Sequence, residues 1–253
     1  MKKNNQPWII AHRGARDEAP ENSLTALRQA FNHDIQGIEF DVQMSSDGVP
    51  VLYHDWTLQK VGAGRKRVSD LTRADLERID WGKWYHPRFV GESLTTLKMA
   101  LSLLNRCPNM CIEIKSNPAD QASGHTNALT DEVLRQINRP KVQPYKNQIL
   151  ILSFDPAVLT RADQANAGLR YVLNLPDTAL TRTIATTQHL WGVGVQISKL
   201  SATLALWVRQ RNLHLLTYTC NGPRQVKKAM QLGVDAIITD RPGWLNRHFN
   251  EVN

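Results

Sequence analysis

The chain has 253 residues, of which 42% are hydrophobic and 21% charged, and an excess of Lys and Arg (31) over Asp and Glu (23) gives it a net charge of +8. This composition is typical of a globular protein with a sizeable core, and it excludes disordered, collagen-like and low-complexity classes. No apolar run approaches the roughly 18 residues that a membrane span requires. The basic residues are scattered without interleaved aromatics, so a solvated basic surface is favoured over nucleic-acid binding.

The N-terminal residues and the cysteines indicate the compartment. The chain runs from two lysines directly into polar residues, without the apolar core of a signal peptide. Its three cysteines, Cys107, Cys111 and Cys220, are odd in number and lack the spacing of a zinc site. They are expected to be ordinary buried thiols of a reducing compartment. We therefore expect a cytoplasmic protein without a membrane span, and its oligomeric state stays open.

Short apolar segments alternate with helical patterns along nearly the whole chain. The predicted strands are 8–12, 37–42, 110–115, 148–154, 169–175, 193–197, 213–218 and 236–239. The predicted helices between them are 23–32, 95–104, 128–137, 157–166, 178–187, 202–211 and 223–232. Eight strands that alternate with helices predict an α/β fold, a TIM (β/α)8 barrel rather than an open sheet.

One segment, from about 43 to 92, interrupts this alternation. It is too long for an ordinary βα loop, and it ends in an aromatic stretch that includes Trp81, Trp84 and Tyr85. We expect one catalytic domain over residues 1–253, with 43–92 as an insertion subdomain after the second strand. That position lies on the barrel face that carries active sites. The three aromatic side chains could cap the substrate or pack the insertion against the barrel, and both interpretations stay open.

Two predicted strands carry charged residues where a buried strand should be apolar. Glu39 and Asp41 are two residues apart and therefore share one face of their strand, and Glu113 and Lys115 repeat this arrangement between isoleucines. Such charges are costly without partners. Converging carboxylates match a hard cation such as Mg²⁺ or Ca²⁺. A structural network of ion pairs among the same groups is the alternative.

Two histidines stand close to these strands in the predicted barrel. His12 ends the first predicted strand and precedes Arg13 and Gly14, and His54 follows the short apolar segment of the insertion. Arg13 offers a fork of donors suited to phosphate, and Gly14 permits a close approach of the backbone. Two histidines beside a cation and a phosphate can divide general-base and general-acid duties near neutral pH.

The order of these motifs resembles the glycerophosphodiester phosphodiesterases, bacterial cytoplasmic type, from about residue 8 to 245. The matching motifs are Ala11-His12-Arg13-Gly14, Pro20-Glu21-Asn22-Ser23, Ile38-Glu39-Phe40-Asp41-Val42, Asp47-Gly48-Val49-Pro50-Val51, His54-Asp55, Glu113-Ile114-Lys115 and the run from Gly233 to Pro242. The family is a TIM barrel with an insertion after its second strand, as expected above.

The resemblance implies catalytic and metal-binding roles for matching residues. His12 corresponds to the family's general base and His54 to its general acid. Glu39, Asp41 and Glu113 match the ligands of one divalent cation, for which Mg²⁺ and Ca²⁺ are the first candidates and Mn²⁺ the third.

The same resemblance implies contacts with the substrate. Arg13 and Lys115 match the family's phosphate contacts, and Glu21 matches a motif glutamate beside that site. Tyr218 stands where the family commonly has tryptophan, and it is expected to form an aromatic wall for the glycerol.

The implied activity is metal-dependent hydrolysis of small-molecule glycerophosphodiesters, such as glycerophosphocholine and glycerophosphoethanolamine, to sn-glycerol 3-phosphate and an alcohol. In the family mechanism the 2-hydroxyl of the substrate attacks phosphorus, and water then opens the cyclic phosphate. A lysophospholipase D or sphingomyelinase D-like phosphodiesterase is the alternative on the same barrel. A basic binding protein on an inactive barrel is another.

Overall fold

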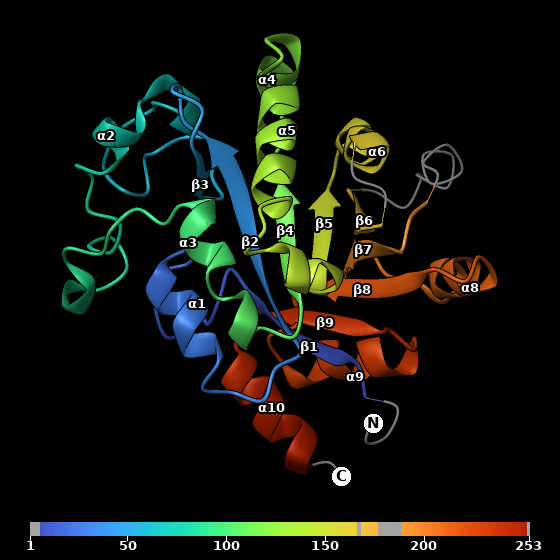
Figure 1. The fold of residues 1–253 in the computed structure, drawn as a ribbon. Helices are drawn as coiled ribbons and strands as arrows, with labels where there is room; N and C mark the ends of the chain where they lie inside the picture. Colours follow the sequence, from blue (N-terminus) through green and yellow to red (C-terminus); the bar gives the residue numbers. More distant parts are fainter. Residues whose placement is uncertain (1–5, 166–167, 177–188, 252–253) are drawn as a thin grey trace.

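The structure is a computed structural model that describes residues 6–165, 168–176 and 189–251. Eight parallel strands close into a barrel surrounded by helices (Figure 1). They are β1 (Trp8–His12), β2 (Gly37–Met44), β4 (Met110–Ile114), β5 (Ile149–Ser153), β6 (Arg170–Leu175), β7 (Gly192–Gln196), β8 (His214–Tyr218) and β9 (Ala236–Thr239). Neighbours pair in the order β1-β9-β8-β7-β6-β5-β4-β2, and the β1–β2 pairing closes the ring. The predicted TIM barrel and its eight strands are confirmed.

A ninth strand, β3 (Pro50–Leu52), turns back antiparallel along β2, with Leu52 opposite Val42 and Pro50 opposite Met44. This return places the residues after β3 beside the carboxyl end of β2, and the Tyr53 N–H donates to the Asp41 carbonyl at 3.2 Å. The antiparallel hairpin therefore brings His54 to the face of the barrel on which the β2 carboxylates lie.

The segment after β3 folds around its own small apolar cluster. The members of this cluster are Val51, Tyr53, Leu58, Val68, Leu76, Trp81 and Leu94. The short elements η1 (Val68–Asp70), α2 (Arg73–Leu76) and η2 (Pro87–Phe89) lie in this segment. Trp81 is buried, and its indole N–H donates to the Leu76 carbonyl at 2.9 Å. The indole N–H of Trp84 in turn donates to the Trp81 carbonyl at 2.9 Å. These contacts favour packing of the insertion over capping of the substrate.

Helices cover the outside of the barrel. They are α1 (Leu24–Ala30), α3 (Leu97–Leu101), α4 (Pro118–Ala122), α5 (His125–Ile137), α6 (Pro156–Ala165), α8 (Ala202–Gln210), α9 (Pro223–Gln231) and α10 (Pro242–Glu251), with 3-10 turns η3 (Leu104–Arg106) and η4 (Gln143–Gln148). The predicted helix at 178–187 lies outside the described residues. The predicted helix at 95–104 is shorter, because Thr96 caps it by accepting the Met99 N–H and a turn ends it after Leu101. The sequence patterns missed α4 and α10.

The core has two layers, because alternate strand residues face opposite sides of the sheet. The barrel interior is filled by Ile10, Cys111, Leu150, Leu152, Val172, Leu216, Ala236 and Ile238. A larger cluster lies between strands and helices. All three cysteines are free and buried, as expected. Among the described residues, no helix is both long and apolar enough to cross a membrane. Polar side chains lie at the carboxyl ends of the strands, next to the apolar side chains of the barrel interior.

Candidate active site

A cavity of about 230 Å³ opens at the carboxyl ends of the barrel strands. Its lining contains seven of the nine residues singled out in the sequence, together with Phe154, Asn174, Gln196 and Thr219. The seven are His12, Arg13, Glu39, Asp41, His54, Glu113 and Tyr218. The two others, Lys115 and Glu21, lie next to this lining and bind its charged groups. The structure therefore brings together all of the predicted site residues.

Glu39, Asp41 and Glu113 form a compact carboxylate group, each offering an oxygen within 4.8 Å of the others. The sheet register explains this, since Asp41 on β2 is paired with Glu113 on β4. All three are buried. Burial, together with the negative charges of Asp41 and Glu113, raises the pKa of Glu39 well above its usual range. Burial also raises the pKa of Glu113, to about 7, against the opposing effect of Lys115.

Asp41 differs from its two neighbours because two cations contact it, whereas Glu113 has one. Arg13 Nε lies 3.2 Å from its carboxylate, and Lys115 Nζ lies 3.5 Å away and 3.1 Å from Glu113. Burial pushes the pKa of Asp41 up, but Lys115 and Arg13 outweigh burial and hold it far below the usual range. The ion-pair network considered as an alternative therefore exists, and it compensates Asp41 in particular.

The donor set nevertheless fits a divalent cation. Glu39 accepts only the backbone N–H of Arg13, at 3.0 Å, among the hydrogen bonds of the described residues. Burial raises the pKa of Glu39 and of Glu113, so a further positive charge beside them would favour their ionised forms. Asn174 adds a buried amide oxygen that has no hydrogen-bond partner within the described part of the chain. Carboxylate and amide oxygens are the ligands that Mg²⁺ and Ca²⁺ prefer.

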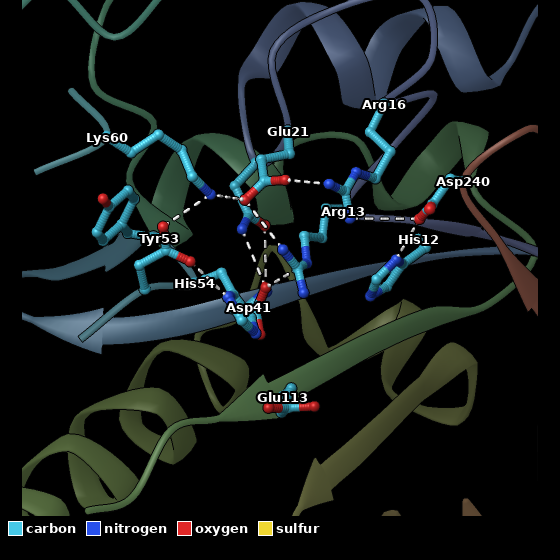
Figure 2. A network of polar contacts seen from close by, with 12 residues as sticks. His12, Arg13, Arg16, Glu21, Asp41, Tyr53, His54, Lys60, Glu113 and Asp240 are labelled. Atoms are coloured by element: carbon cyan, nitrogen blue, oxygen red, sulfur yellow. Dashed lines mark hydrogen bonds and ion pairs between the residues drawn. The ribbon is translucent and has the colours of Figure 1, made fainter. Parts of the chain in front are cut away.

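His12 is oriented by Asp240, the residue that follows β9. His12 Nδ1 lies 2.5 Å from Asp240 Oδ1 (Figure 2). Asn221 donates to the other carboxylate oxygen of Asp240 at 2.7 Å. Burial lowers the pKa of His12 and outweighs the Asp240 hydrogen bond, which raises it. A neutral ring that donates Nδ1–H to Asp240 presents the lone pair of Nε2 to the cavity, as a base requires.

His54 is held in the same manner by its neighbour. Its Nδ1 lies 2.8 Å from Asp55 Oδ1, and Lys60 donates to Asp55 Oδ2 at 2.8 Å. Burial lowers the pKa of His54 as well, while the charge of Asp41 acts in the opposite direction. The pKa directions are the same for both histidines, so they do not distinguish the base from the acid.

The backbone around Arg13 has a left-handed conformation, with φ of +56° at Arg13 and +82° at Gly14. This turn directs the Arg13 N–H at Glu39. A Cβ at Gly14 would lie 2.5 Å from the Ala26 carbonyl carbon, so no side chain fits there. Strained backbone of this kind is characteristic of functional sites.

Aromatic rings form one wall of the cavity. Tyr218 meets Phe154 edge to face, with centroids 6.3 Å apart. Tyr218 was expected in this place and Phe154 was not. The sequence pattern also assigned no role to Asp55, Asn174 and Asp240. For Phe154, Asn174 and Asp240 the signal was their position, since a polar or aromatic residue at the carboxyl end of a barrel strand faces the site. Asp55 follows β3 in the insertion and had no such signal.

Comparison with known proteins identifies the class of this barrel. Residues 12–244 match the model of the glycerophosphoryl diester phosphodiesterase family, and the chain belongs to that family. Its enzyme class is therefore that of the glycerophosphodiester phosphodiesterases.

Individual relatives agree with this class. The glycerophosphodiester phosphodiesterase of Bacillus subtilis (strain 168) is 26% identical over 252 residues, which cover 92% of this chain and 83% of the relative. Human glycerophosphodiester phosphodiesterase 1 is 32% identical over 169 residues, 66% of this chain and 48% of the human protein. A phosphodiesterase from Oleispira antarctica, solved with its product sn-glycerol 3-phosphate, superimposes with a TM-score of 0.84 at 25% identity and covers 96% of this chain and 97% of its own.

Proposed function

We propose that the protein hydrolyses small glycerophosphodiesters, such as glycerophosphocholine and glycerophosphoethanolamine, to sn-glycerol 3-phosphate and an alcohol. The observation that carries this proposal is the pair of imidazoles, His12 and His54, each oriented by a carboxylate on Nδ1 and each lining the same cavity. The product bound by the Oleispira antarctica relative supports this substrate class.

His12 and His54 divide the proton transfers of two steps. His12 Nε2 takes the proton of the substrate 2-hydroxyl as the 2-oxygen bonds to phosphorus, and His54 gives a proton to the departing alcohol. In the second step His54 takes a proton from water as the water oxygen bonds to phosphorus, and His12 returns its proton to the 2-oxygen. The cyclic phosphate formed first thus becomes glycerol 3-phosphate. An internal nucleophile is efficient because it is already held beside phosphorus.

Glu39, Asp41 and Glu113 would hold one divalent cation, with Mg²⁺ and Ca²⁺ as first candidates and Mn²⁺ as the third. When bound, such an ion supplies positive charge to the phosphate oxygens. Arg13 and Lys115 stand beside this group and offer further donors to the phosphate. The Tyr218 ring faces the cavity and packs against the glycerol carbons, while Glu21 fixes the Arg13 guanidinium at 2.9 Å.

The organisation of the chain follows from these roles. We propose that residues 1–253 form one catalytic domain and that residues 43–92 are an insertion subdomain, whose strand β3 delivers His54 to the site. The cytoplasmic location stays a prediction.

Two substrates separate the roles of the histidines. Choline leaves as a poor alkoxide and needs a proton, whereas p-nitrophenolate leaves without one. His54→Ala should lose on the order of 10²–10⁴-fold in kcat on glycerophosphocholine and much less on glycerophospho-p-nitrophenol. His12→Ala should be impaired on both, because the 2-hydroxyl must lose its proton in either case.

The two-substrate comparison also controls for misfolding, which would impair both reactions equally. If the activated leaving group rescues His12→Ala instead, the two roles are exchanged. If it rescues neither variant, leaving-group protonation does not limit the rate and His54 is not the acid.

A further inference from the structure

A second charged cluster, centred on Glu21, adjoins Arg13 of the catalytic cavity (Figure 2). The side chain of Glu21 is only 4% exposed, yet three cations reach it. Its Oε1 accepts from Arg13 at 2.9 Å and from Lys60 at 2.8 Å, and its Oε2 lies 2.8 Å from Arg16. Three cations carry more positive charge than the single carboxylate of Glu21 can neutralise. These cations are therefore expected to contact other acidic groups as well.

Each of two cations also reaches the carboxylate that orients one histidine. Lys60 Nζ lies 2.8 Å from Asp55 Oδ2, and Arg16 Nη1 lies 3.4 Å from Asp240 Oδ1. Glu21 is therefore linked through Lys60 to the Asp55–His54 pair and through Arg16 to the Asp240–His12 pair.

The two links differ in strength. Asp240 also accepts a hydrogen bond from Asn221 at 2.7 Å, so it stays anchored without Arg16, whose contact is long. The Asp55 side chain has no such second anchor: within the described ranges, its carboxylate contacts His54 and Lys60 alone. The Lys60 link should therefore matter more to its histidine than the Arg16 link does.

The ammonium of Lys60 also prevents repulsion between two acids. Glu21, His54 and Asp55 offer ligand atoms within 4.8 Å of one another, an arrangement that could hold a metal ion. Lys60 Nζ already stands 2.8 Å from both carboxylates and supplies the positive charge there. Without it, Asp55, whose side chain is one-third exposed, would turn away from Glu21 toward solvent and release His54.

We propose that Lys60 is a positioning residue for leaving-group protonation: it clamps Asp55 against Glu21 and so holds His54 Nε2 toward the departing oxygen. This role rests on the proposed function, in which His54 is the acid. Misplacement of a catalytic group by about 1 Å can cost on the order of 10²-fold in rate, so the clamp has a measurable effect.

The test measures kcat and KM of Lys60→Gln on glycerophosphocholine and on glycerophospho-p-nitrophenol, with Arg16→Gln as the matched control. The kcat of Lys60→Gln should fall about 10- to 100-fold on glycerophosphocholine and much less on glycerophospho-p-nitrophenol. Its KM should change little on either substrate. Lys60→Arg keeps a charge that reaches both carboxylates and should recover most of the loss. Arg16→Gln should show a smaller loss that is the same on both substrates.

A second variant keeps the test valid if Lys60→Gln folds poorly. Asp55→Asn removes the same link from its other end and should give the same dependence on the leaving group. Adding Lys60→Gln to Asp55→Asn should then cause no further loss on glycerophosphocholine.

Equal losses of Lys60→Gln on both substrates, or no recovery with arginine, would overturn the proposal and leave Lys60 as a purely structural residue. His54→Ala, measured in parallel, distinguishes this failure from failure of the proposed function. If His54→Ala depends on the leaving group and Lys60→Gln does not, only the positioning role is wrong. If His54→Ala shows no such dependence, the acid assignment fails and the role of Lys60 fails with it.

Discussion

Replacing Glu113 by glutamine should stabilise the protein when no divalent ion is present. The pKa of Glu113 is raised to about 7 by burial and by Asp41, from a usual value of 4.5. At about 1.4 kcal/mol per pKa unit, ionisation of this buried carboxyl costs about 3 kcal/mol of folding free energy. Because the folded state holds the proton more tightly than the unfolded state, stability falls as the pH rises from about 4.5 to about 7 and stays low above that range.

The surroundings of Glu113 accept the amide. Lys115 donates to its Oε1 at 3.1 Å, and a glutamine oxygen can accept the same bond. Asn174 donates to Oε2 at 3.0 Å, and turning the Asn174 amide over would point its unpaired buried oxygen at the new NH₂ group. The substitution also removes a negative charge beside Lys115, which offsets part of the gain. Within the described part of the chain, Asp41 at 3.5 Å is then the one remaining ion-pair partner of Lys115. We therefore expect a net gain of about 1–3 kcal/mol at pH 8 and almost none at pH 4.5.

Urea unfolding followed by tryptophan fluorescence, in EDTA at several pH values, measures this difference. Asp41→Asn is the matched control from the same cluster and should have the opposite sign, because Lys115 and Arg13 stabilise the Asp41 carboxylate. Adding a divalent ion at about 100 times its Kd should stabilise the parent by about 2.7 kcal/mol and Glu113→Gln much less. A Glu113→Gln protein that is less stable than the parent at pH 8 in EDTA would refute the reasoning.

Three further predictions follow from the site and the core. Bis(p-nitrophenyl) phosphate lacks a hydroxyl beside its ester oxygen and should be a very poor substrate; rapid release of p-nitrophenol would mean that water attacks phosphorus directly. Burial raises the pKa of Cys107 and of Cys220 to about 12 and that of Cys111 well above its usual range. An aromatic disulfide reagent at pH 8 should therefore label these thiols only after unfolding. Fast labelling of the native protein would contradict their burial. Gly14→Ala should lower the free energy of unfolding by about 2–4 kcal/mol, because the left-handed turn and the Ala26 carbonyl exclude a Cβ; an unchanged urea midpoint would show that the turn adapts.

The barrel could be predicted from sequence because each strand is a short, nearly uninterrupted apolar segment, such as Ile149–Ser153. Buried parallel strands have this pattern, and charges that interrupt it are conspicuous. Glu39, Asp41 and Glu113 were recognisable for that reason. The helix α4 lacked such a signal, since it has five residues and no buried side chain. Helix α10 has ten residues and buries Leu245 and Phe249, so its length does not explain why it was missed.

The contacts that orient the histidines could not be predicted in the same way. Lys60 and Asp55 belong to a segment whose path depends on the apolar cluster around Trp81 rather than on a repeating pattern. A sequence cannot show that an ammonium occupies the space between Glu21 and Asp55, because that space exists only when the insertion is folded onto the barrel. Asp240 is different: its place directly after β9 was a usable signal.

The central claim is most directly tested by following the turnover of glycerophosphocholine by phosphorus-31 NMR, with a divalent ion and with excess EDTA. The diester signal should be replaced by that of sn-glycerol 3-phosphate through a transient cyclic phosphate, and EDTA should stop the conversion. His54→Ala and His12→Ala should slow it under the same conditions. Formation of phosphocholine and glycerol, or undiminished turnover in EDTA, would contradict the account.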